Sequence, residues 1–391
     1  MSRLIAIPVG QGDAFYLERA GWSVLVDGGR SQAGFASAFQ TATRANGANV
    51  VVCTHNDADH ATGILGFLER GFSCGEVWLP GRWLGALPSI LRPFVEVFVD
   101  VAANVADTIE SPRRREGVSP IEAYAEDLRE NSNDQSPHEE EPLIGENGWP
   151  DPYIEMLEQA EPWELTPWVR FWPLEDRPFF PYPHYYRLDP PKVQLLWSAV
   201  DAASRIRAIA IETFHRGIPV RWLEFDAANP SGGVANLQLV NARQVARVRP
   251  RVGPLLALLA LTVSNKQSLV LWAPPMNHDP GVLFTADSDL SGIRLPNQLT
   301  GAVATAPHHG SEANANAYAV VNAAAGCHSS SLTWVRSDGS YRSRPGPTYL
   351  QLASRRFCTL CRNPSSSKQA VHLFAQGGSW APQGTNTCQC R

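Results

Sequence analysis

The feature that constrains the fold most is a set of short apolar runs that each end in acidic residues or histidines. The run "NVVVC" precedes "THNDADH", and comparable runs precede Asp27, Asp287 and the pair His308 and His309. Short runs rich in β-branched residues are typical of buried strands. In α/β proteins, sites are commonly built where such strands end. The sequence therefore predicts an α/β fold whose polar clusters gather at one edge of the strands.

The segments around these runs indicate the same fold class. "FYLERAGWSVLVDGG" predicts two strands joined by a turn at Ala20–Gly21, and "FASAFQTATRANG" and "ATGILGFLERGF" have the apolar spacing of helices. Farther along, "SAVDAASRIRAIAIETFHRG" predicts a helix that ends near Gly217, and "PVRWLEF", "QSLVLWA" and "GVLFTAD" predict strands. The α/β pattern of the start of the chain thus resumes in its second half.

The heptad "THNDADH" carries four candidate metal ligands in an H-x-D-x-D-H pattern, which are His55, Asp57, Asp59 and His60. Imidazole nitrogens and carboxylate oxygens bind Zn²⁺, Mn²⁺ or iron, and alternate residues of an extended turn can converge on one ion. The competing interpretation is that Asn56 or Asp57 caps the following helix and that the histidines are incidental. Capping needs one such residue rather than four, so the heptad favours a metal site.

The order of the motifs resembles that of the metallo-β-lactamase family. "VGQGDAFYLE", "VLVDGG", "THNDADH", "SNKQSLVL", "FTADSD" and "PHHGS" follow one another as they do in the soluble hydrolase domain of ComEC-type DNA-uptake proteins. "WVRSDGSYRSRPGPTYL" is similar to the closing strand and the proline-containing turn of that domain. The resemblance covers residues 1–75 and about 260–352. It implies a metallo-β-lactamase-like αββα sandwich with a long insertion in mid-chain.

The resemblance also implies a centre for two divalent metal ions, Zn²⁺ or Mn²⁺. By this resemblance, His55 and Asp57 would bind one ion, and Asp59 and His60 would bind the other. Asp287 would bridge the two ions. Asp59 would in addition be catalytic, because it would orient a metal-bridging hydroxide that attacks the substrate. Such a centre suits the hydrolysis of a phosphodiester.

The remaining positions of the implied site are less closely defined. One histidine of the pair His308 and His309 would complete the second ion's ligands, and its place at the strand end slightly favours His308. Asp27 would be a structural carboxylate that holds the metal-binding loop through hydrogen bonds. Asp13 would have a similar role, although an aspartate in "GQGD" also suits a simple turn.

Two positions depart from the family pattern. The family more often has a histidine where this chain has Asp57, and it often has another on a strand that corresponds here to "TVSNKQSLVLW". That segment offers Ser264 and Asn265 instead. Oxygen donors in place of nitrogen shift the preference towards Mn²⁺ or Mg²⁺ and away from Zn²⁺.

The extent of the resemblance and the local composition divide the chain into four parts. Residues 1–100 and 191–352 are the two halves of the α/β domain, 101–190 is the insertion, and 353–391 is a cysteine-rich C-terminal extension. The insertion mixes charge runs with proline, glycine and tryptophan, which predicts a partly mobile, partly packed segment. Its tryptophans also suit a surface that binds another protein.

The C-terminal extension holds two cysteine pairs, "CTLC" and "CQC". The four residues are Cys358, Cys361, Cys388 and Cys390. C-x₂-C followed by a second pair is a pattern of structural zinc sites, with His372 as a spare ligand. The alternative is a set of unlinked thiols in a tail that packs as a hairpin. We expect Cys53, Cys74 and Cys327 to be small buried apolar residues.

Composition limits the remaining function classes. A formal charge of −5 gives no overall attraction to nucleic acid, and 44% hydrophobic residues predict a sizeable core. The sequence contains no apolar run of about 18 residues and no signal peptide, and an odd number of cysteines does not suggest a disulfide framework. No Walker motif occurs. We therefore expect a cytoplasmic protein that does not insert into a membrane.

Two functions are weighed from these observations. The first is a dinuclear metal-dependent hydrolase, a phosphodiesterase or nuclease acting on nucleic acid or on a small phosphodiester. The second is a metal-stabilised, non-catalytic interaction or sensor subunit of a multi-protein bacterial system, with the partner bound through residues 101–190. Lactone or β-lactam hydrolysis is disfavoured, because those branches of the family usually keep a histidine in place of Asp57.

Overall fold

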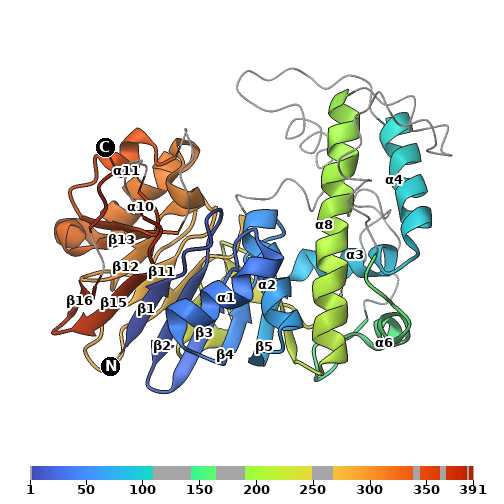
Figure 1. Ribbon diagram of the computed structural model, residues 1–391, viewed down its shortest axis with the longest axis horizontal. Coiled ribbons are helices and arrows are strands. Elements are labelled where there is room, and N and C mark those ends of the chain that lie inside the picture. The colour runs from blue at the N-terminus through green and yellow to red at the C-terminus, as the bar shows by residue number, and fades with distance from the viewer. Residues whose placement is uncertain are drawn as a thin grey trace. The chain divides into compact units, whose positions relative to one another are not determined.

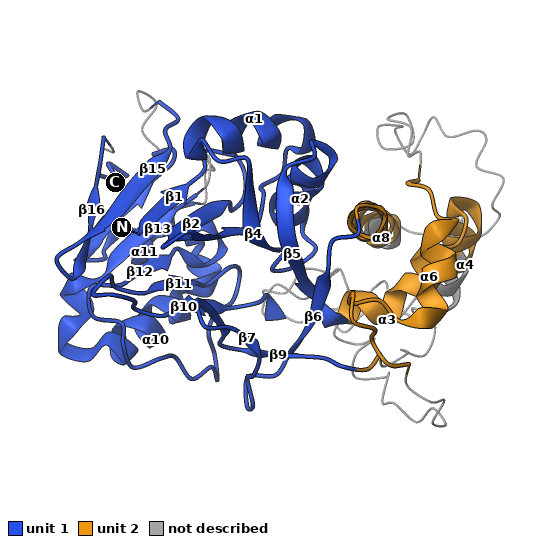
Figure 2. Cartoon of the chain, turned by 90° about the horizontal axis from the view of Figure 1, so that it is seen from below, with its two compact units in different colours: residues 1–81, 217–246, 265–391 blue, residues 82–216, 247–264 orange. Residues whose placement is uncertain are grey.

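The computed structural model describes residues 2–108, 142–163, 190–248, 267–337, 344–361, 367–384 and 387–390. The chain divides into two compact units, shown in different colours in Figure 2. The first unit comprises Met1–Gly81, Gly217–Ala246 and Asn265–Arg391, and the second comprises Arg82–Arg216 and Arg247–Ser264. The candidate ligands named above all belong to the first unit.

Within the described residues of the first unit, nine strands form one mixed sheet. Their order is β16-β15-β1-β2-β3-β4-β5-β6-β9. The bounds are β1 Arg3–Ala6, β2 Phe15–Arg19, β3 Trp22–Val26, β4 Gly47–Val52, β5 Ser73–Pro80, β6 Val220–Phe225, β9 Ala242–Gln244, β15 Val371–Gln376 and β16 Ser379–Pro382. Strands β3 to β6 run parallel to one another, and the flanking pairs are antiparallel.

A second mixed sheet has seven strands among the described residues, in the order β14-β13-β12-β11-β10-β8-β7. The bounds are β7 Gly233–Val234, β8 Leu237–Leu239, β10 Leu271–Ala273, β11 Val282–Phe284, β12 Val303–Thr305, β13 Thr333–Arg336 and β14 Arg355–Cys358. Strands β11 to β14 are parallel. The chain is therefore a mixed α/β protein, as its sequence predicts.

The two sheets share one apolar core. Phe15 of the first sheet packs on Phe284 of the second, with ring centroids 6.2 Å apart, and the same cluster includes Val26 and Val335. Because side chains alternate along a strand, the next residue, Tyr16, faces the opposite side. Tyr16 meets Phe39 of a helix there, at 5.6 Å.

Helices cover the outer face of each sheet (Figure 1). On the nine-stranded sheet, α1 (Gln32–Thr43) and α2 (Ala58–Glu69) lie side by side. On the seven-stranded sheet, α10 (Ala315–Ala325) places Tyr318 4.9 Å from the ring of Trp334 in β13. The remaining short helices of this unit are η4 Pro307–Gly310, η5 Glu312–Asn314, η6 Gly326–Ser331 and α11 Pro347–Leu350.

The local sequence signals explain where these elements start and stop. Ser31 caps α1 by accepting a hydrogen bond from the amide of Gly34, and Arg44 ends the helix in the left-handed region. Ala20 (φ 47°) and Gly21 (φ 80°) make the tight turn between β2 and β3. Positive φ at both residues matches the turn type that two-residue hairpins prefer, so the predicted hairpin is confirmed.

In the second unit, the regular elements among the described residues are helices, and isolated β-bridges pair Leu143 with Arg247 and Ile144 with Pro150. Its helices are α3 Gly81–Ile90, α4 Phe94–Thr108, α6 Asp151–Glu158 and α8 Pro190–His215. Arg207 of α8 is buried, and its guanidinium donates to the carbonyls of Ile90, Arg92 and Glu161. These bonds connect α8 to the segments that follow α3 and α6.

The boundaries of this unit differ from the predicted insertion. We expected 101–190, whereas the compact unit begins at Arg82 and includes α8, which the sequence analysis assigned to the second half of the α/β domain. The reason is that α8 contacts α4 and α6. Most of the charged and Trp/Pro-rich sequence of the insertion lies outside the described residues.

Among the helices that the structure describes, none combines the length and the apolar composition needed to cross a membrane.

Candidate metal centre

The predicted ligands come together where strands of both sheets end. Asp27 directly follows β3, and His55 lies three residues after β4. Asp287 lies three residues after β11, and His308 and His309 lie in η4, just after β12. We call one set of these side chains the His/Asp centre: His55, Asp57, Asp59, His60, Asp287 and His309.

His55, Asp57 and Asp287 form a first group of candidate ligands. Nε2 of His55 lies 3.8 Å from Oδ2 of Asp57 and 3.7 Å from Oδ2 of Asp287. Ligand atoms of all three residues lie within 4.8 Å of one another. With metal–ligand bonds of about 2.0–2.2 Å, one ion can reach all three.

A second group lies around the other oxygen of Asp287. Nε2 of His60 lies 3.2 Å from Oδ1 of Asp287, and Nε2 of His309 lies 4.0 Å from the same atom. Oδ2 of Asp59 is 3.4 Å from Nε2 of His309. Asp13, His60, Asp287 and His309 again have ligand atoms within 4.8 Å of one another. The second group can therefore hold a second ion.

Asp287 belongs to both groups. Its Oδ1 faces His60 and His309, and its Oδ2 faces His55 and also His308, whose Nε2 is 3.6 Å away. The side chain is 2% exposed. A carboxylate with one oxygen in each group has the arrangement that a bridging ligand requires.

Each histidine around the centre is held through Nδ1. The partners are Thr54 Oγ1 for His55 (2.9 Å), Asp27 Oδ2 for His60 (2.8 Å), Asn314 Oδ1 for His308 (2.9 Å) and Asp13 Oδ1 for His309 (2.9 Å). A ring that donates from Nδ1 keeps its lone pair on Nε2, which is the tautomer that ligates a metal through Nε2. The ring orientations thus suit metal binding.

Asp27 and Thr54 connect two of these histidines. Asp27 accepts hydrogen bonds from the amide and the hydroxyl of Thr54, both at 2.8 Å, while it holds Nδ1 of His60. Since the Thr54 hydroxyl donates to Asp27, its oxygen accepts from Nδ1 of His55. One carboxylate therefore fixes the start of the metal-binding loop and the ring of His60 together.

Several buried atoms of the centre have no hydrogen-bond partner among the described residues. They are Oδ2 of Asp13, Oδ1 of Asp287 and Nε2 of His55, His60 and His309. A buried polar atom without a partner costs about 1–3 kcal/mol, so five in one place are unfavourable for the protein alone. When the rings are neutral, nitrogen and oxygen lone pairs face a common space, and a divalent cation is a group that accepts them.

The electrostatic environment shifts the pKa values of the histidines in different directions. Burial disfavours a charged ring, but Asp287 raises the pKa of His60 well above its ordinary value, and Asp13 raises the pKa of His309 to about 10. Burial and the neighbouring charge of His60 lower the pKa of His55. In the metal-free protein, His60 and His309 are therefore charged at neutral pH and His55 is not.

The carboxylates respond to those charges. Burial opposes ionisation of Asp59, yet the ring of His309, 3.4 Å away, and the charge of His60 lower the pKa of that carboxyl. Burial opposes ionisation of Asp287 too, and His60 and His308 hold its pKa well below the usual range. Both side chains are thus carboxylates at neutral pH, which is the form in which a carboxyl group can bind a metal ion.

Helix capping does not explain the aspartate at the start of α2. Asp57 does occupy the N-cap position of α2, but its side chain makes no capping hydrogen bond. Its carboxylate lies near His55 instead. Capping therefore does not account for Asp57.

Backbone contacts hold the loops of the centre in place. A Cβ on Gly12 would lie 1.7 Å from the carbonyl oxygen of Asp59, and a Cβ on Gly28 would lie 2.4 Å from the amide nitrogen of Ile64. The Gly28 amide donates to the carbonyl of His60 at 2.8 Å. Gly12 of "GQGD" and Gly28 of "DGG" are thus needed for close approach to α2.

The "PHHG" segment is strained. His308 (φ 45°) and His309 (φ 55°) are consecutive non-glycine residues in the left-handed region. Such conformations cost on the order of 1–3 kcal/mol each and concentrate at functional sites. The strain turns the two rings to different parts of the centre, His309 to Asp59 and His308 to Asn314.

The centre is accessible from one side. The side chains of Asp57, His308 and Asp59 are 31%, 23% and 18% exposed, whereas those of His60 and His309 are fully buried. Arg344 lies at this side, where it donates to Nε2 of His308 at 2.9 Å. A cation next to the exposed ligands suits an anionic substrate.

The geometry assigns the histidine pair differently from the strand-end argument. His309, rather than His308, lies beside Asp59 and joins the second group, while His308 lies at the exposed side of the first group. The difference arises because the left-handed turn after Pro307 reverses the chain. Ser264 and Asn265 lie outside the described residues.

Three supporting residues were not anticipated from the sequence. Thr54 is part of the heptad, and only its contacts reveal its role. Asn314 holds His308 and also donates to the carbonyl of Asp287 at 2.8 Å. Arg344 lies in the "SRPGP" turn. By sequence this turn is similar to one in the family, but the resemblance assigned no function to Arg344.

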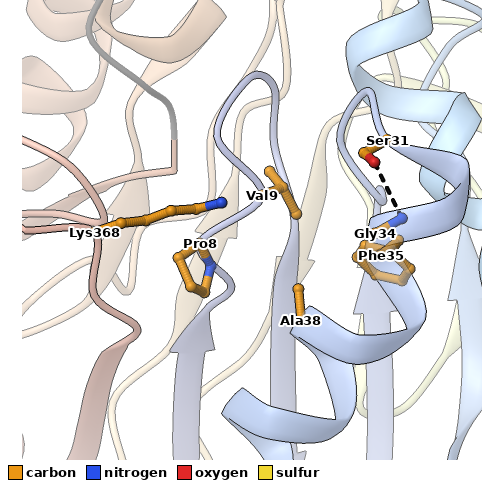
Figure 3. A pocket seen from close by; sticks show the side chains of 7 residues that line it. All are labelled: Pro8, Val9, Ser31, Gly34, Phe35, Ala38 and Lys368. Carbon is orange, nitrogen blue, oxygen red and sulfur yellow. Dashed lines mark hydrogen bonds between the residues drawn. The ribbon is translucent and has the colours of Figure 1, made fainter.

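A small cavity lies outside the centre. It measures about 100 Å³ and lies between the loop that precedes Asp13 and the first turns of α1, with Lys368 at its side (Figure 3). It is lined by Pro8, Val9, Ser31, Gly34, Phe35, Ala38 and Lys368. None of the candidate ligands lines it, so we assign it no part in the chemistry of the centre.

The cysteines form a separate group. Cys358, Cys361, Cys388 and Cys390 have sulfur atoms within 4.8 Å of one another, and none of the seven cysteines forms a disulfide. We call these four the cysteine cluster. The expectation that the other three are buried holds for Cys53 but is wrong for Cys327, which is exposed in η6, and Cys74 in β5 is half-buried.

Comparison with known proteins adds no assignment. No protein-family model matches this chain, and a search of curated proteins finds no match.

Proposed function

We propose that this chain is a metallo-β-lactamase-fold hydrolase of the ComEC-like kind that uses two divalent metal ions, Mn²⁺ or Zn²⁺, to cleave phosphodiesters. The single observation that carries the proposal is the two-sided position of Asp287 between two groups of buried, partnerless ligand atoms. The two packed sheets, the outer helices and the order of the motifs are consistent with the family.

Two divalent ions, when bound, supply Lewis-acid stabilisation of phosphoryl oxygens and make water more acidic. His55, Asp57 and Asp287 would hold one, and Asp59, His60, His309 and Asp287 the other. The protein's own contribution is orientation, because Asp27, Asp13 and Thr54 fix the histidine rings before any ion binds.

Asp59 is the residue that we assign to the chemical step. Its carboxylate is 18% exposed and its pKa is lowered, so it stays ionised beside the accessible side of the centre. A permanently ionised carboxylate is a good acceptor for a hydrogen bond from the attacking water and a poor store for its proton. Asp59 would therefore orient the water.

Arg344 favours a phosphodiester over an uncharged substrate. The guanidinium fork matches two oxygens of a phosphate, and Arg344 donates to the partly exposed ring of His308 beside the His/Asp centre. The formal charge of −5 does not favour tight, non-specific binding of DNA. A small phosphodiester is therefore a candidate substrate as well as single-stranded DNA.

The experiment measures Mn²⁺-dependent hydrolysis of labelled single-stranded DNA and of bis(p-nitrophenyl) phosphate. Wild type is compared with Asp59→Asn and with Glu69→Gln, which removes a carboxylate from the far end of the same helix. We expect Asp59→Asn to reduce turnover by about 100- to 10,000-fold and Glu69→Gln to leave it unchanged. Absence of turnover in metal-loaded wild type would instead favour a non-catalytic interaction or sensor subunit.

A further inference from the structure

The C-terminal segment brings together four thiols that the hydrolase centre does not use. Cys358 ends β14 and Cys361 follows it, whereas Cys388 and Cys390 come after β16. Strands β15 and β16 lie between the two pairs in the sequence, and the fold nevertheless returns the second pair to the first. Cys358, Cys361 and Cys390 are buried, and Cys388 is half-buried.

The spacing of the sulfur atoms fits a single tetrahedral ion. Zn–S bonds of about 2.3 Å place the four sulfurs of a tetrahedral site roughly 3.8 Å apart. All four Sγ atoms here lie within 4.8 Å of one another, and Sγ of Cys358 lies 3.0 Å from Sγ of Cys388. A multi-iron cluster is larger than one ion and holds its cysteine sulfurs farther apart.

The surroundings favour thiolates over thiols. The amide of Gln389 donates to Sγ of Cys361 at 3.2 Å, and the amide of Cys390 points to Sγ of Cys388 at 3.4 Å. Nε of Arg336, a fully buried guanidinium, lies 3.5 Å from Sγ of Cys358. Four thiolates around Zn²⁺ carry a net charge of −2, which amide donors and a buried cation offset.

We propose that Cys358, Cys361, Cys388 and Cys390 bind one zinc ion in a closed tetrathiolate site with a structural role. Protein sulfur fills all four positions, which leaves no coordination position for a substrate. His372 is not part of the group, because it lies within β15, paired with Ile5 of β1.

The site joins the ends of the two sheets. β16 is an edge strand of the nine-stranded sheet, and β14 is an edge strand of the seven-stranded sheet. After β16, the amide of Cys388 donates to the carbonyl of Arg356 in β14 at 2.8 Å, so the segment runs along that edge. A zinc ion there fixes the final residues of the chain over an otherwise open sheet edge.

The zinc site also lies next to a support of the His/Asp centre. Arg336, which contacts Cys358, has its Cδ 3.2 Å from the position a Cβ on Gly310 would take. Gly310 directly follows His309. Loss of zinc would therefore reach the metal-binding turn through one buried side chain, as a secondary effect.

The test measures bound zinc directly, in full-length protein purified under reducing conditions. The Asp287→Asn background removes the shared ligand of the His/Asp centre, so that any tightly held zinc comes from elsewhere. We expect one zinc ion per chain in that background and its loss in Cys361→Ser/Cys390→Ser. Cys327→Ser changes an exposed cysteine outside the cluster and serves as the matched control, which should keep the zinc.

Two measurements on the wild-type cysteines guard against misfolding of the double variant. Replacement of zinc by Co²⁺ should give the thiolate-to-cobalt charge-transfer absorption of a tetrahedral sulfur site, which histidine and carboxylate ligands cannot give. Alkylation of native protein should spare the four cluster cysteines until zinc is removed, while Cys327 reacts at once.

Several results would overturn the proposal. Protein that holds no zinc and takes up none, cluster cysteines recovered as disulfides, or a coloured iron-containing site would each do so. None of these outcomes depends on hydrolysis. The zinc site and the proposed phosphodiesterase can therefore fail or succeed separately.

Discussion

The His/Asp centre and the cysteine cluster are two candidate metal sites built in opposite ways. In the His/Asp centre, each histidine has a supporting partner on Nδ1, and one side is accessible through Asp57 and His308. In the cysteine cluster, backbone amides surround the sulfurs, and three of the four residues are buried.

The difference corresponds to the general distinction between catalytic and structural metal sites. Catalytic sites keep a position open and hold their ligands rigidly, whereas structural sites are closed by protein ligands on all sides. In this chain the proposed catalytic centre would draw its ligands from strand ends of both sheets, and the proposed structural site would draw them from β14 and the segments around β16. Each prediction below separates the two sites.

The largest expected effect comes from Asp287→Asn. Asp287 is the only side chain common to both groups of the His/Asp centre, so its loss weakens both ions at once. Loss of several kcal/mol of transition-state stabilisation corresponds to a decrease in kcat/KM on the order of 1,000-fold. The measurement is phosphodiester hydrolysis at saturating Mn²⁺, with bound metal counted in parallel.

Asp289→Asn is the control, since that side chain lies two residues farther on and accepts from the amide of Ser291 through an oxygen that asparagine keeps. We expect normal activity there. Retention of zinc by the cysteine cluster in both variants is also expected. If Asp287→Asn kept full activity, Asp287 would not be the shared ligand.

Metal binding at the His/Asp centre should weaken as the pH falls. His60 and His309 have raised pKa values in the metal-free protein, about 10 for His309, so both rings are protonated at neutral pH. A ring must lose its proton from Nε2 to ligate, and uptake of metal therefore releases protons. The apparent affinity should fall about tenfold per pH unit for each proton displaced.

Titration calorimetry in buffers of different ionisation enthalpy measures the number of protons released. Between about pH 8 and about pH 6, the cysteine cluster should keep its zinc, because tetrathiolate sites bind zinc far more tightly. Affinity at the His/Asp centre that did not change with pH would contradict the charge states assigned to His60 and His309.

The smallest effect is expected for Thr54→Val. The substitution keeps the shape and the backbone amide bond to Asp27 but removes the hydroxyl that links Asp27 to His55. A hydrogen bond of this kind contributes about 1 kcal/mol, so metal affinity should fall roughly fivefold. Thr43→Val, which removes a buried hydroxyl at the end of α1, should lower stability but not metal affinity.

The sequence was most informative where chemistry and local structure coincide. "THNDADH" predicts a helix start and a ligand cluster in the same seven residues, and α2 begins there with Asp57 as its N-cap. The β2–β3 hairpin, β4 and the long helix α8 were likewise predictable, because their periodicity or their turn residues are strong.

Other features depend on long-range contacts that no local pattern encodes. The choice between His308 and His309 follows from a strained turn whose φ values arise only in the folded chain. The extent of the second unit follows from which helices α8 meets. Asn314 and Thr54 are common polar residues, and only their hydrogen-bond partners set them apart.

The close contact between α2 and the loop after β3 makes the spacing of the centre a property of the main chain. A Cβ on Gly63 would lie 1.8 Å from the carbonyl oxygen of Gly28, and the amide of Gly63 donates to the carbonyl of Gly29 at 2.9 Å, so backbone contacts hold the helix against that loop. A ligand lengthened by one methylene, as in Asp59→Glu, could not be accommodated by moving α2. To accept an ion of another size, the centre would therefore have to change its donor atoms. The backbone positions that carry those donors would stay the same.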